Sequence, residues 1–249
     1  MKNIKIRLEK SKMTLYNNLR GYMTYIGKGI YTLTSAAKLL GIEQSRIRRW
    51  IKGYTYSKNL ECYSRKPLVE TEFEYEPNDL IISFLDLTEL LFIKSFIQHG
   101  ISVQKIRKAA MAASNLLNTS HPFAVKKMFT DGKSIFAKIA QEDNDYSLLD
   151  LLTKQYQIRA IIEPTLYERI DFDRYNFAEK WWPLGKNKDI VLDPSRNMGQ
   201  PILNKFNIRT NLIYELHNTN HSIEEISDWY ELDKNSIKTA IGFENGLVA

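Results

Sequence analysis

Two short amphipathic segments separated by a glycine dominate the pattern of apolar and polar positions in residues 31–53. Apolar residues recur at helical spacing up to Leu40, and Thr34 stands where a capping residue would begin that helix. Gly41 then supplies a left-handed turn residue, and a second helix is expected from about Gln44 to Lys52. Two short helices around a tight turn predict a helix-turn-helix.

The second helix divides into an apolar face and a basic face. Ile47, Trp50 and Ile51 share one side at 100° per residue, so we expect them to pack inward. The opposite side carries Ser45, Arg46, Arg48, Arg49 and Lys52. A merely solvated helix usually mixes charges for i,i+4 pairing, yet this one has no acid after Glu43. The pattern therefore favours a helix that faces DNA, with the arginines donating to guanine edges and phosphates.

Residues 54–82 alternate polar and aromatic positions and are predicted to be β or irregular. Following a helix-turn-helix, such a segment is typical of a wing whose basic side chains lie on the DNA backbone. Tyr54, Arg65 and Lys66 are its candidate contacts. The acidic stretch Glu70–Pro77 is expected to face away from DNA.

A pair of apolar helices comes next. Asp86 and Glu89 have the spacing of a capping box, Gly100 ends the first helix, and Ser102 caps the second. The first helix is too apolar on all sides for a surface helix, so the pair buries a face either in the core or in a dimer interface.

Residues 120–185 are mixed and predict a small α+β connector. Asp131-Gly132 between apolar runs indicates a hairpin, residues 147–162 are expected to be helical, and residues 163–184 are aromatic and loop-like. The Trp181-Trp182 pair is either a partner-binding hot spot or a buried hinge, and the size of tryptophan favours the hinge.

The tail predicts strand, turn and strand in residues 189–203, followed by three short helices. Thr210 opens the first, a capping box runs over Ser222–Glu225, and Asp233 caps the last. These helices resemble a homeodomain-like bundle in length. The region has a net charge of −2, so a protein-binding or dimerising role is favoured over a second DNA contact, for which Ser236, Lys238 and Thr239 are the few candidates.

The predicted fold is mainly α with an α+β connector. Its four parts are a basic arm (1–30), a winged helix-turn-helix with the following helix pair (31–119), the connector (120–185) and the homeodomain-like domain (186–249).

The charge distribution supports a nucleic-acid partner for the N-terminal part. The net charge is +6, but residues 1–67 hold 15 Lys and Arg against 3 Asp and Glu, a local charge of +12. Residues 68–185 have a net charge of −4. A single cysteine, Cys62, suits a reducing cytoplasm, and no stretch is apolar enough to span a membrane. We therefore expect a cytoplasmic protein.

Catalytic or metal sites have weak support. His217 and His221 are four residues apart, but they straddle a predicted helix end and lack the glutamate of the metalloprotease pattern. An acidic cluster could hold magnesium in a nuclease, although neighbouring arginines favour surface ion pairs. Its acids are Glu163, Glu168, Asp171 and Asp173, and the arginines are Arg159, Arg169 and Arg174. We expect no cofactor, no metal and no enzymatic activity.

The stretch "YTLTSAAKLLGIEQSRIRRW" resembles the MerR-type winged helix-turn-helix, and "LDLTELLFIKSFIQHGISVQKIRKA" resembles the helix pair that follows the wing in that family. The tail, with "VLDPSRNMGQPIL" and "SIEEISDWYEL", is similar to a bacterial family of unknown function, number 433. Together with "HPFAVKKMFTDGKSIF" and "WWPLG", the layout resembles VapB-type antitoxins and related regulators over residues 31–249. Glu43 at the cap position, Arg49 in place of an aromatic residue and "NKFNIRT" in the tail depart from the family patterns.

The resemblance implies a repressor of its own operon that binds and neutralises a PIN-like ribonuclease toxin. From the helix-turn-helix itself we expect a homodimer whose two basic helices enter successive major grooves of double-stranded DNA, so the operator should be an inverted repeat. Two alternatives stay open. One is a MerR-like regulator that responds to a small effector and has no toxin; the other is a metal-dependent nuclease that uses the acidic cluster.

Overall fold

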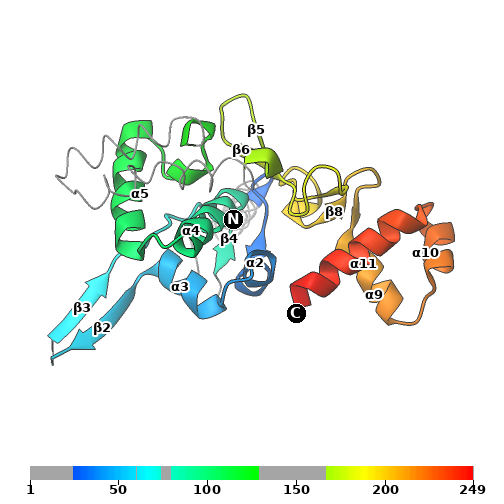
Figure 1. The fold of residues 1–249 in the computed structure, drawn as a ribbon, viewed down its shortest axis with the longest axis horizontal. Helices are drawn as coiled ribbons and strands as arrows, with labels where there is room; N and C mark the ends of the chain where they lie inside the picture. Colours follow the sequence, from blue (N-terminus) through cyan, green and yellow to red (C-terminus); the bar gives the residue numbers. More distant parts are fainter. Residues whose placement is uncertain (1–24, 60, 74–79, 129–166, 249) are drawn as a thin grey trace, which may run out of the picture.

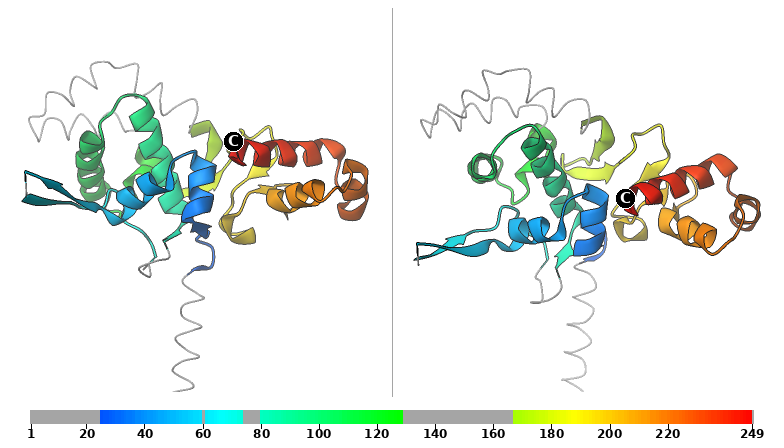
Figure 2. Two further views of the ribbon diagram at one scale, coloured as in Figure 1. Left: turned by 90° about the horizontal axis from the view of Figure 1, so that it is seen from below. Right: turned by 60° about the horizontal axis from the view of Figure 1, so that its bottom comes forward.

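The computed structural model describes residues 25–59, 61–73, 80–128 and 167–248. Its helices and small antiparallel sheets make an α+β fold, as predicted (Figure 1). A two-stranded hairpin projects from one end of the molecule, and helix α10 lies at the opposite end in all views (Figures 1 and 2). Within these ranges no helix is both long and apolar enough to cross a bilayer.

The predicted helix-turn-helix is formed by α2 (Leu33–Leu40) and α3 (Gln44–Lys52). The cap of α2 is Thr32, whose hydroxyl accepts from the backbone N–H of Ser35 at 3.1 Å, so the prediction of Thr34 as the cap was wrong by two residues. Gly41 ends α2 in the left-handed conformation, as expected. Lys94 adds a donor from another helix by binding the carbonyl oxygen of Leu40.

Two small sheets flank α3. Strands β2 (Tyr54–Lys58) and β3 (Glu61–Arg65) pair as an antiparallel hairpin, which confirms the β structure predicted after the second helix. Strand β1 (Tyr31–Thr32) pairs antiparallel with β4 (Ile81–Ile82). This second pairing fixes where α2 begins, because β1 leads directly into it.

Helices α4 (Phe84–Gln98) and α5 (Val103–Leu117) form the predicted pair. Ser102 caps α5 as expected. The capping box of α4 is Ser83 with Asp86, so the predicted pairing of Asp86 with Glu89 was wrong. Glu89 instead lies within α4, buried, and accepts a hydrogen bond from the backbone of Phe123 in the short 3-10 helix η1 (Pro122–Ala124).

Part of the connector is a hairpin where a loop was expected. After η2 (Tyr167–Arg169), strands β5 (Ile170–Phe172) and β6 (Ala178–Trp181) pair antiparallel with a register shift. Trp181 is buried and Trp182 half-buried, which agrees with the buried alternative for the tryptophan pair. The predicted Asp131-Gly132 hairpin and the helix over 147–162 lie outside the described residues.

The C-terminal region has the predicted strands and three helices. Strands β7 (Ile190–Val191), β8 (Ile202–Leu203) and β9 (Ile208–Arg209) form one antiparallel sheet, with the 3-10 helix η3 (Asn197–Gly199) between β7 and β8. Helices α9 (Thr210–Asn218), α10 (Ile223–Tyr230) and α11 (Lys234–Val248) follow. The capping box over Ser222–Glu225 and the cap at Asp233 are both present.

Two apolar cores hold these parts. The larger is built from β1, α2–α5, η1 and β5–β6; the smaller surrounds Ile213, Ile226 and Ile237 in the C-terminal region. Leu39 of α2 packs against both cores. The helix-turn-helix and the C-terminal helices are therefore packed together through α2, as Figure 2 shows from two sides.

Candidate nucleic-acid interface

Helix α3 divides into the two faces that its sequence predicts. Ile47, Trp50 and Ile51 are buried in the larger core. Ser45, Arg46, Arg48 and Arg49 are exposed, and Lys52 at the end of the helix is half-buried. The structure thus anchors α3 through three apolar side chains and leaves its basic face on the surface.

The arginines of α3 have no acidic partners within the described part of the chain. None of the ion pairs there includes Arg46, Arg48 or Arg49. The nearest acid in sequence, Glu43, makes no capping hydrogen bond to the helix and contacts Ser45 only weakly, at 3.4 Å. Guanidinium groups that are not neutralised internally are available to phosphates and base edges.

The hairpin β2–β3 begins directly after α3 and is held close to it by Gly53. This glycine has φ 70°, and a Cβ atom there would lie 2.3 Å from the carbonyl oxygen of Arg65 on the returning strand. Any other residue would force the two ends of the hairpin apart. The sequence places a glycine where the chain must turn sharply out of α3 into the hairpin.

The segment that follows β3, residues 66–69, is tied to α3 and α5 through its backbone groups. The N–H groups of Leu68 and Val69 donate to the carbonyl oxygen of Trp50 at 2.6 and 3.2 Å. Arg107 of α5 reaches the carbonyl oxygens of Lys66 and Pro67, the second at 2.6 Å. The base of the hairpin is therefore fixed to α3, so that α3 and the hairpin are presented as one unit.

The hairpin carries an aromatic and basic surface, and the sequence predicted only some of its residues as DNA contacts. Tyr54, Arg65 and Lys66 are exposed, as expected of contacts. Tyr56 was not predicted: its ring stacks on Tyr63 at 5.4 Å, and its hydroxyl accepts from Arg65 at 3.2 Å. The alternation of tyrosines in the sequence could have indicated this cross-strand pair, because Tyr56 and Tyr63 are directly opposite in the ladder.

The C-terminal helices α10 and α11 repeat the geometry of α2 and α3. Both first helices have eight residues, both begin at a Ser or Thr cap, and both end on a left-handed residue, Gly41 (φ 57°, ψ 47°) or Glu231 (φ 52°, ψ 41°). In each unit the next residue, Ile42 or Leu232, is buried and donates its N–H at 3.1 Å to the carbonyl five residues earlier. The buried Ile47 of α3 corresponds to the buried Ile237 of α11.

The two helix-turn-helix units differ in charge where the first helix begins. The first turn of α2 carries Thr34 and Ser35, whereas the same positions of α10 carry the exposed acids Glu224 and Glu225. The first helix of such a unit crosses the DNA backbone, where carboxylates repel phosphates. Lys234 at the start of α11 is also neutralised by Glu224 at 2.6 Å.

The alternative chemical sites are not assembled as the sequence suggested. Asp171 binds Lys186 at 2.6 Å and the indole N–H of Trp182 at 2.8 Å, while Asp173 accepts backbone N–H groups of its own turn. The expected arginine partners are absent from these contacts, and Glu163 and Arg159 lie outside the described residues. His221 packs edge-on against Trp229, and the part of the chain that the structure describes contains no group of three or more possible metal ligands.

Comparisons with known proteins agree with this two-part organisation. Residues 29–110 match a family described as "Putative DNA-binding HTH domain", and residues 190–243 match one described as "Protein of unknown function (DUF433)". The chain is 22% identical over 222 residues to "Putative antitoxin VapB45" from Mycobacterium tuberculosis H37Rv, covering 85% of this chain and 92% of that protein. The crystal structure of Rv2018 from the same species superposes with a TM-score of 0.67 at 20% identity, covering 85% of this chain and 96% of that chain.

These matches confirm the predicted resemblance to a VapB-type protein and to the unknown-function family, while the MerR-like detail stays a prediction. The chain joins an N-terminal helix-turn-helix of the family described as "Putative DNA-binding HTH domain" to a C-terminal domain of the DUF433 family.

Proposed function

We propose that this protein is a dimeric, DNA-binding antitoxin that represses its own operon. The observation that carries the proposal is the exposed basic face of α3, whose arginines have no acidic partner among the described residues and lie beside a hairpin anchored to the same helix. The similarity to a putative VapB antitoxin supports the antitoxin role. Two copies of α3 entering successive major grooves would require an inverted repeat in the operator.

The residues divide into base-reading and backbone-binding groups. Arg48 and Arg49 project from the middle of α3 and are assigned to base edges, which arginine can bind with two parallel hydrogen bonds. The backbone contacts are assigned to polar and cationic residues toward the ends of α3 and at the base of the hairpin: Ser45, Arg46, Lys52, Tyr54, Arg65 and Lys66.

Footprinting and binding titrations on the protein's own promoter test the DNA half of the proposal. Arg48→Ala is expected to cost about 1–3 kcal/mol of binding free energy and to relax preference at one base position. Arg174→Ala removes an equally exposed arginine from the β5–β6 turn and should leave binding unchanged. The proposal would be contradicted if DNA affinity did not depend on salt concentration, or if both variants lost the same amount of binding free energy.

The toxin-binding surface is assigned to the C-terminal helix-turn-helix. Its acidic first turn disfavours DNA, while Trp229 on α10 is 55% exposed and large enough to act as an interface anchor. An acidic surface with an exposed tryptophan suits a basic protein partner, and the partner we propose is a PIN-like ribonuclease.

Co-purification with a PIN-like protein encoded beside the gene tests this second half. Trp229→Ala should weaken the complex by about tenfold or more, whereas Tyr175→Ala removes an exposed aromatic residue from the β5–β6 turn and should not. If the complex forms equally well in both variants, the toxin does not bind at α10.

A second candidate function is that of a regulator that responds to a small effector. It is favoured by a pocket between α5 and the segment that follows the hairpin. The third alternative, a metal-dependent nuclease, predicts RNA cleavage with Mg²⁺ that is lost in Glu168→Ala. We propose instead that the protein has no enzymatic activity, so incubation of the purified chain with RNA and Mg²⁺ should give no turnover.

A further inference from the structure

A pocket of about 680 Å³ opens between α5 and the segment that returns from the wing. Its walls come from the wing base at Lys66–Val69, from Ala110 and Met111 of α5, and from Pro122 of η1. Ile51 of α3 also borders it. This volume is within the range of sites that bind small organic molecules. Eight of the fifteen lining residues are apolar, and the charged residues Lys66, Glu70, Glu89 and Arg107 also line the pocket.

Glu89 of α4 lies at the base of this pocket with only 2% of its surface exposed. Its Oε1 accepts a hydrogen bond from the backbone N–H of Phe123 at 3.0 Å. The other carboxyl oxygen makes no hydrogen bond with any described residue. Every fully buried side-chain polar atom among the described residues has a hydrogen-bond partner, so this unpaired oxygen is not fully buried. The free oxygen of Glu89 therefore faces the pocket, where a ligand can reach it.

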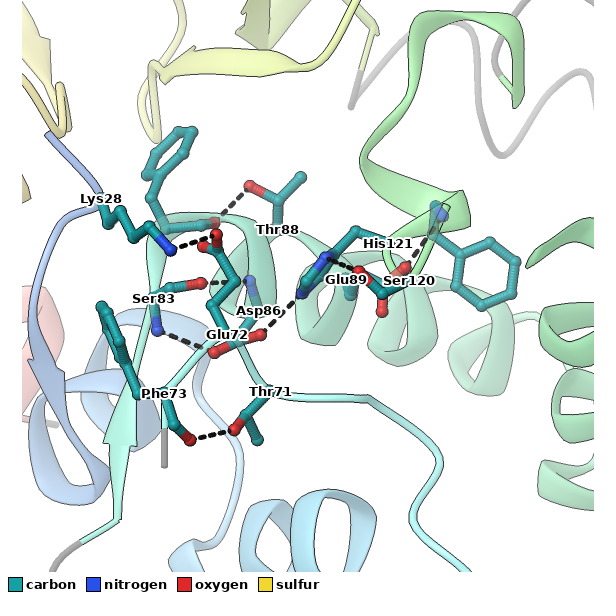
Figure 3. A network of polar contacts seen from close by, with 12 residues as sticks. Lys28, Thr71, Glu72, Phe73, Ser83, Asp86, Thr88, Glu89, Ser120 and His121 are labelled. Carbon is teal, nitrogen blue, oxygen red and sulfur yellow. Dashed lines mark hydrogen bonds and ion pairs between the residues drawn. The ribbon is translucent and has the colours of Figure 1, made fainter. Parts of the chain in front are cut away.

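Burial favours the protonated form of this carboxyl group at neutral pH. The pKa of Glu89 is raised to about 8. Burial is the largest cause, His121 and the hydrogen bond from Phe123 oppose it, and the charges of Asp86 and Glu70 add to it. His121 is itself paired with Asp86 at 2.9 Å, so its charge is largely compensated there (Figure 3). Because Oε1 already accepts a hydrogen bond, the proton belongs on Oε2, and the pocket-facing oxygen is a hydrogen-bond donor.

We propose that this pocket binds a small, mainly apolar molecule that presents a hydrogen-bond acceptor, such as a carbonyl oxygen, to Glu89. The apolar walls bury the body of the ligand, and Glu89 fixes its orientation. The pocket borders both α3 and the base of the wing, so a bound ligand would affect the surface that we assign to DNA binding. Only this effect on DNA binding rests on the proposed function.

Ligand-observed fluorine NMR on the full chain tests the site without DNA. The probe is 4-fluoroacetophenone, and 1-ethyl-4-fluorobenzene has the same shape without the carbonyl oxygen. We expect the ketone to bind about tenfold more tightly, because only the ketone satisfies the donor on Glu89. Glu89→Gln keeps a donor at the same place and should retain this preference, whereas Glu89→Leu should abolish it.

A matched pair of substitutions tests the location. Ala110 and Ala112 are both half-buried alanines of α5, but only Ala110 lines the pocket. Ala110→Leu should weaken binding of the ketone by at least about fivefold through lost volume, while Ala112→Leu should leave it unchanged. The proposal would be overturned if the two probes bound with equal affinity or if the two alanine variants had equal effects. It would also be overturned if the ketone did not bind at concentrations up to about 10 mM, which is near the weakest affinity expected of so small a probe.

Discussion

The hydroxyl of Tyr31 donates a 2.6 Å hydrogen bond to the carbonyl oxygen of Gly199, 168 residues away in the chain. Tyr31 belongs to β1, directly before the helix-turn-helix, and Gly199 ends η3 in the C-terminal region. Burial and the charge of Asp193 raise the pKa of Tyr31, so the phenol stays a donor. Two further hydrogen bonds, from Ile30 to Met198 and from Gln200 to Ile30, make this a fixed junction between the two parts of the molecule.

Gly199→Ala is expected to break this junction. Gly199 has φ 80°, and a Cβ atom there would lie 2.5 Å from the Tyr31 hydroxyl. We expect a loss of roughly 2 kcal/mol or more in the free energy of unfolding, measured by urea denaturation, from backbone strain and overlap together. Gly100→Ala is the control, because Gly100 has a similar φ of 83° but open space around it. If both alanine variants lost the same free energy of unfolding, the close approach of residue 199 to Tyr31 would contribute nothing to the destabilisation.

The helix-turn-helix was predictable because its signals are local. A periodic apolar face, a glycine in the left-handed conformation and a basic outer face lie within residues 31–53, and α3 begins and ends where the pattern places it. The cap of α2 was misplaced because Thr32, Thr34 and Ser35 are all good caps. The pairing of β1 with β4, which involves residues fifty positions apart, selects Thr32.

The buried position of Glu89 could not be predicted, because its burial depends on a partner far along the chain. Its spacing from Asp86 suggested a capping box, but the contact that defines its role is with the backbone of Phe123. The pocket likewise forms only when the wing base, α5 and η1 come together. The repeat of the helix-turn-helix was hidden for a different reason: Glu231 occupies the left-handed position where a pattern search expects glycine.

The two left-handed turn residues should respond to substitution with opposite signs. Gly41→Ala is expected to reduce the free energy of unfolding by about 1 kcal/mol, since a Cβ atom there would meet only Lys94 Nζ at 3.5 Å and the cost is backbone strain. Glu231→Gly removes the same strain from the second unit and should stabilise the chain by about 0.5 kcal/mol. Chemical denaturation of both variants measures the difference; destabilisation of similar size in both would contradict equivalent turns.

Arg107 is expected to control the position of the wing without touching α3. Arg107→Met keeps the aliphatic stem but removes the donors to the Lys66 and Pro67 carbonyl oxygens. The amides of Leu68 and Val69, which bind Trp50, should then exchange with solvent about tenfold faster in hydrogen-exchange experiments. Gln104→Met on the exposed side of α5 is the control and should leave both exchange rates unchanged. If both variants exchange alike, the anchoring of the hairpin comes from Trp50 alone.

Glu89 and His121 should make the protein less stable as pH rises through neutrality. Glu89 has a pKa of about 8 when folded against an ordinary value of 4.5, so between these values the unfolded chain loses its proton and the folded chain keeps it. Burial by itself would lower the pKa of His121, but the hydrogen bond that His121 donates to the Asp86 carboxylate and the nearby carboxyl groups outweigh burial and raise the pKa. The stability from His121 is full below pH 6.5 and is lost as pH rises through its folded pKa.

Glu89→Gln separates the two contributions. The amide stays neutral at every pH, so the variant should lose the decline that Glu89 imposes between about pH 5 and 8 and keep the part that comes from His121. Thermal unfolding at about pH 5.5 and pH 7.5 measures this: the Tm difference between the variant and the wild type should shift in favour of the variant at the higher pH. Parallel pH profiles would mean that Glu89 is ionised in the folded chain. The pocket would then present a carboxylate in place of a donor, and the preference of the site for carbonyl ligands would be lost with it.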